Sequence, residues 1–405
     1  MGKKMVYVSQ WNVKGQPSEE ELATNGGAKG GVSIYELGED GVSVTYKGHF
    51  DGPARSSCLT YVKENDTLYI VHQTKGQGRN AWQAGSTVWA CKIDHNTGML
   101  TEIDRIPTMG GNPEAVSQVP GKLQLCLACT GGNDHVEKII QTNDGTWTTK
   151  YEYDDGAISM LELNEDGTFG KWLDVQMHRD HGPDPSSSVQ HNGRCQITGH
   201  PHSCTINQTG QFLVSGDKGN DTAFVYKIHD DRLELVSRRW LGDVVGGRHV
   251  AFDPTNPLRF FMTTEYSSEL FCFDIDEESG GLHQLDRIST VAEGFARRNE
   301  PATLRVSPDG KYIFLNNRGE DDIVTVEAKP DGKLIRKYAF QMSHFEGDPV
   351  NATRQFEMSP DNKYLFVGER PANLLHVLGI NDDGTLRDIQ ATPVVNPTSV
   401  CFVEI

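Results

Sequence analysis

SPDGKYIFLNNRG, residues 307–319, joins a polar turn to an apolar run, and a second copy, SPDNKYLFVGER, occupies residues 359–370. Four further segments share this pattern: NDTLYIVHQ (65–73), GKLQLCLAC (121–129), GQFLVSGDKG (210–219) and LRFFMTTEY (258–266). The copies recur about every 50 residues, apart from one interval of 87 residues between Cys126 and Leu213. Repetition at this spacing predicts an array of similar structural units.

A second pattern counts the units independently. Acidic or Gly-containing turns that lead into a last strand occur seven times: 37–46, 94–103, 163–172, 229–236, 276–285, 329–338 and 381–389. The first pattern supplies six copies. We therefore predict that the seventh unit is split between SVCFVEI (399–405) and KMVYVSQ (4–10). Pairing these two segments closes a ring and removes the strand edges that would otherwise stay open.

The segments between the turns predict the fold class. They are rich in β-branched and aromatic residues and are bounded by Gly, Asp and Asn turns at intervals of about 8–12 residues, which is typical of all-β folds. We predict an all-β, seven-bladed β-propeller whose ring is closed by the N- and C-terminal strands. Residues 1–405 are expected to form one propeller domain, with a His-, Pro- and Ser-rich insertion at about 176–200 in the long interval.

Composition limits the partners and the location of the chain. Its 405 residues carry a formal net charge of −18, a poor match to nucleic acid and to anionic membranes, so we expect neither as a partner. The start, MGKKMVYVSQ, lacks the apolar region of a secretory signal. We therefore expect a cytoplasmic protein whose eight cysteines are free thiols. The oligomeric state is left open.

The predicted hairpins bring charged residues to one mouth of the channel. In an antiparallel hairpin, the first residues of one strand lie beside the last residues of its partner. Those positions select the following residues: His72, Gln73, Glu114, Thr130, His202, Asp217, Arg248, His249, Glu265, Thr303, Arg318, Arg354 and Glu369. Burying so many charges without a ligand is costly unless they pair. This favours a ligand site, with a water-filled network of ion pairs as the alternative.

The insertion raises the question of a metal. It carries five histidines: His178, His181, His191, His200 and His202. His200 and His202 would share one face of a strand, but no further Cys or Asp falls at typical ligand spacing. Cys126 and Cys129 would point to opposite faces of a strand. We predict no metal and no cofactor, and a role for the insertion beside or in contact with the substrate.

Five segments occur in this order: HNGRCQITGHPHS (191–203), GGRHVAFDP (246–254), TTEYSS (263–268), SPDGKYIFLNNRGEDDI (307–323) and NPTSVCFVEI (396–405). Together they resemble the lactonase-type seven-bladed propellers, a family that includes bacterial 6-phosphogluconolactonases and fungal carboxymuconate cycloisomerases. The resemblance covers essentially the whole chain and is weaker in the first 110 residues. It implies that the functional residues of the family fall on His202, Arg248, Glu265 and Arg318, with His249 and Arg354 nearby.

Two positions depart from the family pattern. Thr303 stands where the family often has an acidic residue, although Glu300 lies just upstream, and Glu369 stands where Gln or Asn is common. Both positions belong to the predicted mouth, so they bear on the identity of the substrate more than on the fold.

The resemblance implies hydrolysis of a small anionic sugar-acid lactone, or the related syn addition–elimination by which a cycloisomerase or lyase makes or opens a lactone. Both reactions need cations that bind a carboxylate or phosphate and stabilise charge on a carbonyl oxygen. Both also need a His or Glu whose pKa lies near neutrality. A non-catalytic binding propeller is the alternative from another class, and it would predict an apolar or aromatic rim.

On this basis we assign roles to the mouth residues. Catalysis is assigned to His202 as general base or acid, to Glu265 for orientation or proton transfer, and to Arg318. Anion binding is expected of Arg318 as well as of Arg248 and Arg354. The residues assigned to substrate binding are Arg248, His249, Arg354, His200 and Glu369.

Overall fold

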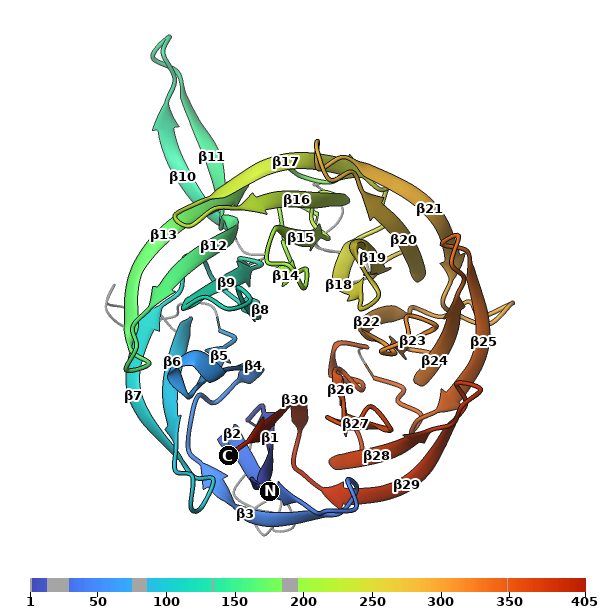
Figure 1. Cartoon of the computed structure of the whole chain (residues 1–405). Coiled ribbons are helices and arrows are strands. Elements are labelled where there is room, and N and C mark those ends of the chain that lie inside the picture. Colours follow the sequence, from blue (N-terminus) through green and yellow to red (C-terminus); the bar gives the residue numbers. More distant parts are fainter. Residues whose placement is uncertain (1, 13–28, 75–85, 133–134, 184–195, 348) are drawn as a thin grey trace.

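The computed structural model describes residues 2–12, 29–74, 86–132, 135–183, 196–347 and 349–405. These residues form seven four-stranded antiparallel sheets arranged in a ring, together with one separate two-stranded hairpin (Figure 1). The predicted all-β, seven-bladed propeller is confirmed.

Each blade begins at the propeller axis and ends at the rim. Blade 1 contains β30 (Pro397–Glu404), β1 (Lys4–Gln10), β2 (Gly31–Leu37) and β3 (Val44–Phe50). Blade 2 contains β4 (Ser56–Val62), β5 (Thr67–His72), β6 (Thr87–Ile93) and β7 (Leu100–Pro107). Blade 3 contains β8 (Pro113–Gln118), β9 (Gln124–Cys129), β12 (Gly156–Leu163) and β13 (Phe169–His178). Blade 4 contains β14 (Thr205–Ile206), β15 (Phe212–Asp217), β16 (Thr222–Ile228) and β17 (Leu233–Trp240).

The remaining blades follow the same order. Blade 5 contains β18 (Gly247–Asp253), β19 (Asn256–Thr264), β20 (Glu269–Ile275) and β21 (Leu282–Ser289). Blade 6 contains β22 (Glu300–Val306), β23 (Tyr312–Arg318), β24 (Asp322–Ala328) and β25 (Leu334–Gln341). Blade 7 contains β26 (Phe356–Met358), β27 (Tyr364–Glu369), β28 (Leu374–Ile380) and β29 (Leu386–Pro393).

Blade 1 closes the ring as predicted. Its innermost strand, β30, pairs antiparallel with β1, so that Val403 faces Met5 and Cys401 faces Tyr7. The backbone of Ile405 extends the pairing by exchanging two hydrogen bonds with Lys3, of 2.9 and 2.8 Å. The N- and C-terminal segments thus satisfy each other's backbone groups and leave no open edge at this position.

Packing between blades explains why the middle strands are apolar on both faces. Seven clusters of buried apolar side chains lie one between each pair of neighbouring blades. Every residue of β23 is buried, whereas most residues of the rim strand β25 are exposed. A strand that is covered on both sides reads as a continuous apolar run.

The turn between the first two strands of a blade explains the repeated S-P-D-G/N motif. Gly310 and Asn362 occupy the same position of this turn with φ of 72° and 59°, a left-handed conformation that Gly and Asn tolerate. The hydroxyls of Ser307 and Ser359 accept the backbone N–H that begins the next strand, at 2.8 and 3.0 Å. The motif therefore fixes the register of the hairpin that reaches the channel.

The long interval in the repeat holds two additions, where the sequence indicated one. The first is the hairpin of β10 (His135–Gln141) and β11 (Trp147–Tyr153), which projects from the ring (Figure 1). The second follows β13, and residues 176–178 of the expected insertion belong to that strand. Residues 184–195, with His191, lie outside the described residues. The hairpin was missed because its strands and its Asn-Asp-Gly turn look like those of a blade.

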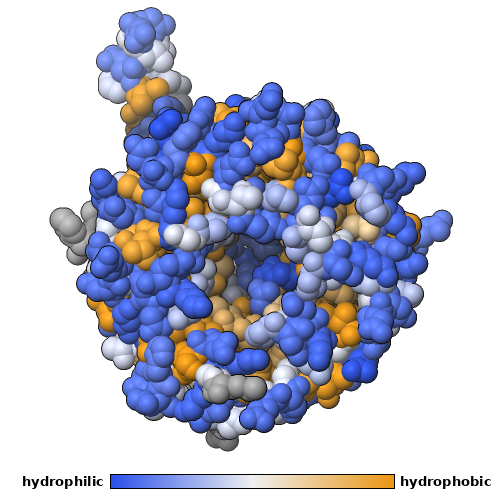
Figure 2. Space-filling model, in the orientation of Figure 1, coloured by the Kyte–Doolittle hydropathy of each residue, from blue (hydrophilic) through white to orange (hydrophobic). Residues whose placement is uncertain are grey.

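Polar side chains cover most of the face shown in Figure 2, and both polar and apolar residues surround the depression at its centre. Among the described residues, no helix has the length and apolar character needed to cross a membrane.

Candidate active site

Strand pairing places equivalent residues of successive blades in a ring, which we call the inner ring. Val250 pairs with Met262 in blade 5 as Leu304 pairs with Leu315 in blade 6. In each blade, the inner-ring residue lies two positions before the residue of the innermost strand that corresponds to Val250 or Leu304. Blades 2 to 7 contribute Ser57, Glu114, His202, Arg248, Ala302 and Arg354, respectively.

A second ring, the outer ring, surrounds the inner one at the same mouth. In each blade, the outer-ring residue lies three positions after the residue of the second strand that corresponds to Met262 or Leu315. This position is at the end of the second strand or directly after it. Blades 2 to 7 contribute Gln73, Thr130, Lys218, Glu265, Arg318 and Arg370, respectively. Most of the ionisable groups of the two rings come from blades 3 to 7.

The carboxylate of Glu265 contacts three cations on one side of the mouth. Its Oε2 accepts from Arg248 Nε at 2.6 Å and from Arg318 Nη2 at 3.4 Å, and its Oε1 accepts from Lys218 Nζ at 2.9 Å. Burial raises the pKa of Glu265, but the charges of Lys218, Arg248 and Arg318 outweigh it and hold the pKa well below the usual value for glutamate. Glu265 is therefore an ionised carboxylate that fixes two arginines in place.

Glu300 completes the coordination of Arg318. The Arg318 Nη2 lies 2.9 Å from Glu300 Oε2, and its Nε donates to the backbone carbonyl of Glu300 at 3.0 Å. Arg298 donates to the other carboxylate oxygen of Glu300. Arg318 is buried and is held by two carboxylates, so its guanidinium has one orientation.

Glu114 is the corresponding acid on the other side. Its Oε2 accepts from Arg354 Nη2 at 2.7 Å and lies 3.8 Å from His202 Nε2, while Gln73 donates to its Oε1. Glu114 therefore joins an arginine of blade 7 to a histidine of blade 4 across the channel.

Two imidazoles lie between these acidic hubs. The rings of His202 and His249 have centroids 5.0 Å apart, and Arg248 Nη1 lies 3.3 Å from His249 Nε2. Burial, followed by the charge of Arg248, lowers the pKa of both histidines well below 6.5. Both rings are neutral at neutral pH and can accept a proton, but their pKa values are not near neutrality as the sequence argument expected.

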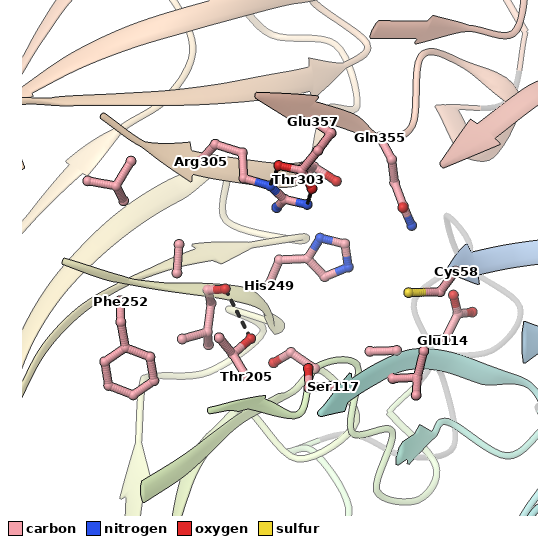
Figure 3. Close-up of a pocket in the computed structure, with 16 residues that line it drawn as sticks. Cys58, Glu114, Ser117, Thr205, His249, Phe252, Thr303, Arg305, Gln355 and Glu357 are labelled. Carbon is pink, nitrogen blue, oxygen red and sulfur yellow. Dashed lines mark hydrogen bonds and ion pairs between the residues drawn. The ribbon is translucent and has the colours of Figure 1, made fainter. Parts of the chain in front are cut away.

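A cavity of about 420 Å³ continues from the inner ring into the channel. Figure 3 shows His249 pointing into it, with Glu114 and Gln355 on one side and Arg305, held by Glu357, on another. The cavity gives a small molecule access to His249 and Glu114, whereas His202 does not line it.

A model of the lactonase family of seven-bladed β-propellers matches residues 118–403 of the chain. The chain belongs to this lactonase family. It is 24% identical to the 6-phosphogluconolactonase of Bacillus subtilis over 387 residues, which cover 93% of this chain and 95% of that protein.

Solved structures resemble this protein in fold. A protein from Lactobacillus plantarum has a TM-score of 0.77 and 19% identity, and the match covers 99% of this chain and 100% of that one. The periplasmic gluconolactonase of Pseudomonas aeruginosa has a TM-score of 0.75 and 22% identity, and 99% of each chain is covered.

Six of the predicted site residues form one connected network. Arg248 and Arg318 meet at Glu265, and the His249 ring links Arg248 to His202. His202 and Arg354 then meet at Glu114. The network thus joins His202, Arg248, Glu265, Arg318 and Arg354, with His249 as a link.

His200 lies beside this network with its own partners. Its backbone N–H donates to Asp217 Oδ1 at 2.7 Å, and its Nδ1 contacts the carbonyl of Thr130. Burial, followed by the charge of Lys218, lowers the pKa of His200 to about 4. His200 and His202 precede β14 and do not form a regular strand, in contrast to the expectation that they share a strand face.

Glu369 is oriented differently from Arg318, with which the sequence argument grouped it. Its Oε1 accepts the backbone N–H of Ser343 at 2.6 Å, and its Oε2 lies 2.7 Å from His376 Nε2. Arg370, one residue later, holds the outer-ring position. A shift of one residue in a strand turns a side chain to the other face, which is why Glu369 contacts its blade neighbours.

His178 and His181 of the insertion have hydrogen-bond partners within the fold. His178 Nδ1 lies 2.6 Å from Asp217 Oδ2, and its Nε2 lies 2.7 Å from the Tyr226 hydroxyl. His181 Nδ1 contacts the carbonyl of Gly182 at 2.7 Å. In the part of the chain that the structure describes, no group of three His, Cys, Asp or Glu side chains is arranged to hold a metal ion.

Several residues of the mouth were not predicted from the sequence: Trp11, Arg55, Lys218 and Arg370, with Glu300 noted but given no role. A strict count along the repeat would have found two of them. Arg370 is the twelfth residue of SPDNKYLFVGER, as Arg318 is of SPDGKYIFLNNR. The pairing of β15 puts Lys218 at the same position.

Proposed function

We propose that this protein hydrolyses a small, anionic sugar-acid lactone. The observation that supports this most is that one buried carboxylate, Glu265, holds Arg248 and Arg318 beside two neutral imidazoles. This arrangement supplies a proton acceptor and fixed cations, the two requirements of ester hydrolysis. The relative in Bacillus subtilis, named a 6-phosphogluconolactonase, supports the same reaction.

His202 acts as the general base. Its neutral imidazole takes a proton from water as the water oxygen adds to the lactone carbonyl carbon. The tetrahedral intermediate then breaks the bond to the ring oxygen, which leaves as a hydroxyl after receiving that proton. An anionic substrate offsets the charge of Arg248, so its binding raises the pKa of His202 and makes it a better base.

Arg318 stabilises the negative charge that develops on the carbonyl oxygen, and Arg248 binds the anionic substrate. Glu265 orients them and, because it is ionised and bound by three cations, it is a positioning residue and not a proton donor. Fixing the donors before the reaction lets them act without reorganisation in the transition state.

The other functions weighed from the sequence receive less support. The comparisons give none to a cycloisomerase or lyase. A binding propeller would predict an apolar or aromatic rim, whereas most ring positions in blades 3 to 7 carry ionisable side chains. The expected partner is the small anionic substrate itself. The cytoplasmic location stays a prediction.

A hydrolysis assay tests the proposal. Purified protein would be mixed with 6-phosphogluconolactone and, separately, with gluconolactone, and acid release would be followed in a pH-stat with the spontaneous rate subtracted. We expect acceleration of at least one of the two reactions. Rates equal to the spontaneous ones with both lactones would overturn the proposal.

The pH profile should reflect the lowered histidine pKa values. Since the imidazoles of His202 and His249 stay neutral well below pH 6.5, kcat/KM should show no loss of activity between pH 8 and pH 6. The fall in kcat/KM on the acidic side of the profile should occur below pH 6. A fall centred near pH 6.5 would indicate a solvent-exposed histidine as the base. The measurement is kcat/KM against pH, corrected for spontaneous hydrolysis at each value.

Arg248→Ala should weaken substrate binding more than Arg248→Lys does. The alanine variant removes a buried cation and leaves Glu265 with one partner fewer, and hydrogen bonds to charged groups contribute about 1.5–3 kcal/mol. We expect KM to rise by about 10- to 100-fold, with a smaller rise for lysine because it keeps the charge but not the planar donor geometry. Equal KM values for both variants would contradict a role for the guanidinium.

A further inference from the structure

The hairpin of β10 and β11 has two chemically different faces. Residues directly opposite each other in an antiparallel pair share a face, and successive residues of a strand alternate between faces. One face carries Ile139 and Trp147, whose side chains are 76% and 67% exposed, and Tyr151, which is 50% exposed. Tyr153 continues this face at the base of the hairpin and is also exposed. We call these four residues the Trp147 row.

The opposite face of the hairpin is charged and forms its own ion pairs. Lys138 Nζ contacts one oxygen of the Glu152 carboxylate, and Lys150 Nζ lies 3.6 Å from the other. On the face of the Trp147 row, Glu137 is the one charged residue among the described side chains. A sheet with one polar face and one apolar face is typical of strands whose apolar face is covered by another element.

The propeller itself does not cover the Trp147 row. The hairpin projects away from the ring (Figure 1), and the exposed fractions show that the row faces solvent. Its two strands form a sheet of their own, without a third strand among the described residues. A two-stranded hairpin is marginally stable in water, and packing against another element stabilises it. These observations favour an apolar surface on another molecule as the cover.

The order of side chains makes the Trp147 row complementary to itself. Ile139 and Thr149 form the central pair of this face. Trp147 lies in the next pair toward the tip, and Tyr151 lies in the next pair toward the base. A two-fold axis through the central pair places Trp147 of each copy against Tyr151 of the other. An interface with this symmetry uses the same surface on both subunits.

Charge and area both fit a second copy of the chain. Residues 135–153 contain two lysines and three acidic residues, so their formal charge is −1, whereas the whole chain carries −18. Two acidic propellers repel each other, and a nearly neutral projection lets them meet at a distance. Because a fully covered aromatic side chain buries about 150–250 Å², the exposed parts of the row offer about 400–500 Å² per copy. With its polar neighbours, the dimer buries about 1,000 Å², the size of a weak and reversible interface.

We propose that this protein forms a homodimer through the Trp147 row, with the β10–β11 hairpins of two copies packed face to face about a two-fold axis. The two hairpins then form a two-layer sandwich of four strands outside both rings. The contact uses no residue of the inner or outer ring, so it is independent of the proposed lactone hydrolysis.

Sedimentation velocity over a concentration series, from low micromolar to submillimolar, tests the dimer. We expect the wild type to pass from monomer to dimer with a dissociation constant in the micromolar range. Trp147→Thr and Ile139→Thr should each raise this constant at least about 10-fold, as the loss of a central interface side chain does. Threonine favours a strand, so the hairpin is kept. Val136→Thr is the matched control, because Val136 is 60% exposed on the charged face, and it should associate as the wild type does.

Cross-linking tests the face-to-face geometry without removing Trp147. Packed sheets lie about 10 Å apart, so Ile139→Cys should form a covalent dimer with a bis-maleimide of about that span. Val136→Cys points away from the partner and should stay monomeric, with the wild type as the blank for the native cysteines. A wild type that remains monomeric at every concentration would overturn the proposal. Dimers that form equally in Trp147→Thr and Ile139→Thr would also overturn it, because the interface would then lie elsewhere.

Discussion

His202→Ala should lower kcat for lactone hydrolysis by about 10²–10⁴-fold, the usual contribution of a residue that transfers a proton. The side chain is buried, and its Nε2 lies 3.8 Å from Glu114. The backbone N–H of His202 donates to the carbonyl of Gly216 at 2.9 Å, and alanine keeps this bond. The variant should therefore fold with the wild-type blade and lose the base alone. Steady-state kinetics and a thermal melt on the same preparation measure both effects.

Two controls distinguish chemistry from packing. His49→Ala removes a buried ring from β3, at the rim of blade 1, where its Nε2 contacts the carbonyl of Gly30, and it should leave kcat near the wild-type value. Imidazole added to His202→Ala should restore part of the activity, since it supplies the missing base. Full activity in His202→Ala together with a large loss in His249→Ala would transfer the role of base to His249.

The fold was predictable because each blade repeats the same pattern of a polar turn followed by an apolar strand. The left-handed backbone at Gly310 and Asn362 favours Gly or Asn. The middle strands of each blade are covered by the neighbouring blades, so they must be apolar on both faces. These requirements appear directly in the sequence. The β10–β11 hairpin was not predictable, because Ile139 and Trp147 are 76% and 67% exposed there and their apolar character indicated a buried strand.

The types of residue that line the mouth could be predicted from the sequence, but their exact positions could not. Hairpin geometry alone selected His202, Arg248 and Arg354, because they share the inner-ring position. It selected Glu369 in place of Arg370 because an unaligned strand end has an uncertainty of one residue, and one residue decides the face.

Contacts between distant segments could not be inferred in this way. Arg55, Arg354 and Arg370 surround the Trp11 ring at the end of β1. Trp11 and Arg370 hold equivalent positions of the repeat, but that equivalence does not predict which side chains are in contact. The pKa shifts of His202 and His249 also depend on burial and on neighbours from other blades.

Deleting residues 399–405 should prevent formation of a stable monomeric propeller. The deletion removes most of β30, the innermost strand of blade 1, and exposes the backbone groups of β1 that pair with it. Val400 and Val403 are buried in the clusters on the two sides of blade 1. Burial of such side chains contributes about 1.5–3 kcal/mol each, against a total stability of about 5–15 kcal/mol for a typical domain.

The lost strand pairing adds to this, and the exposed edge of β1 favours aggregation. Thermal unfolding and size-exclusion chromatography measure the effect. The matched control replaces residues 136–152 of the projecting hairpin by a short Gly-Ser loop, which removes more residues but little buried surface, and it should melt close to the full-length protein. A truncated protein that remains monomeric and melts with the wild type would mean that β30 does not close the ring. The two deletions together separate the number of residues lost from their position, because only the smaller one opens the ring.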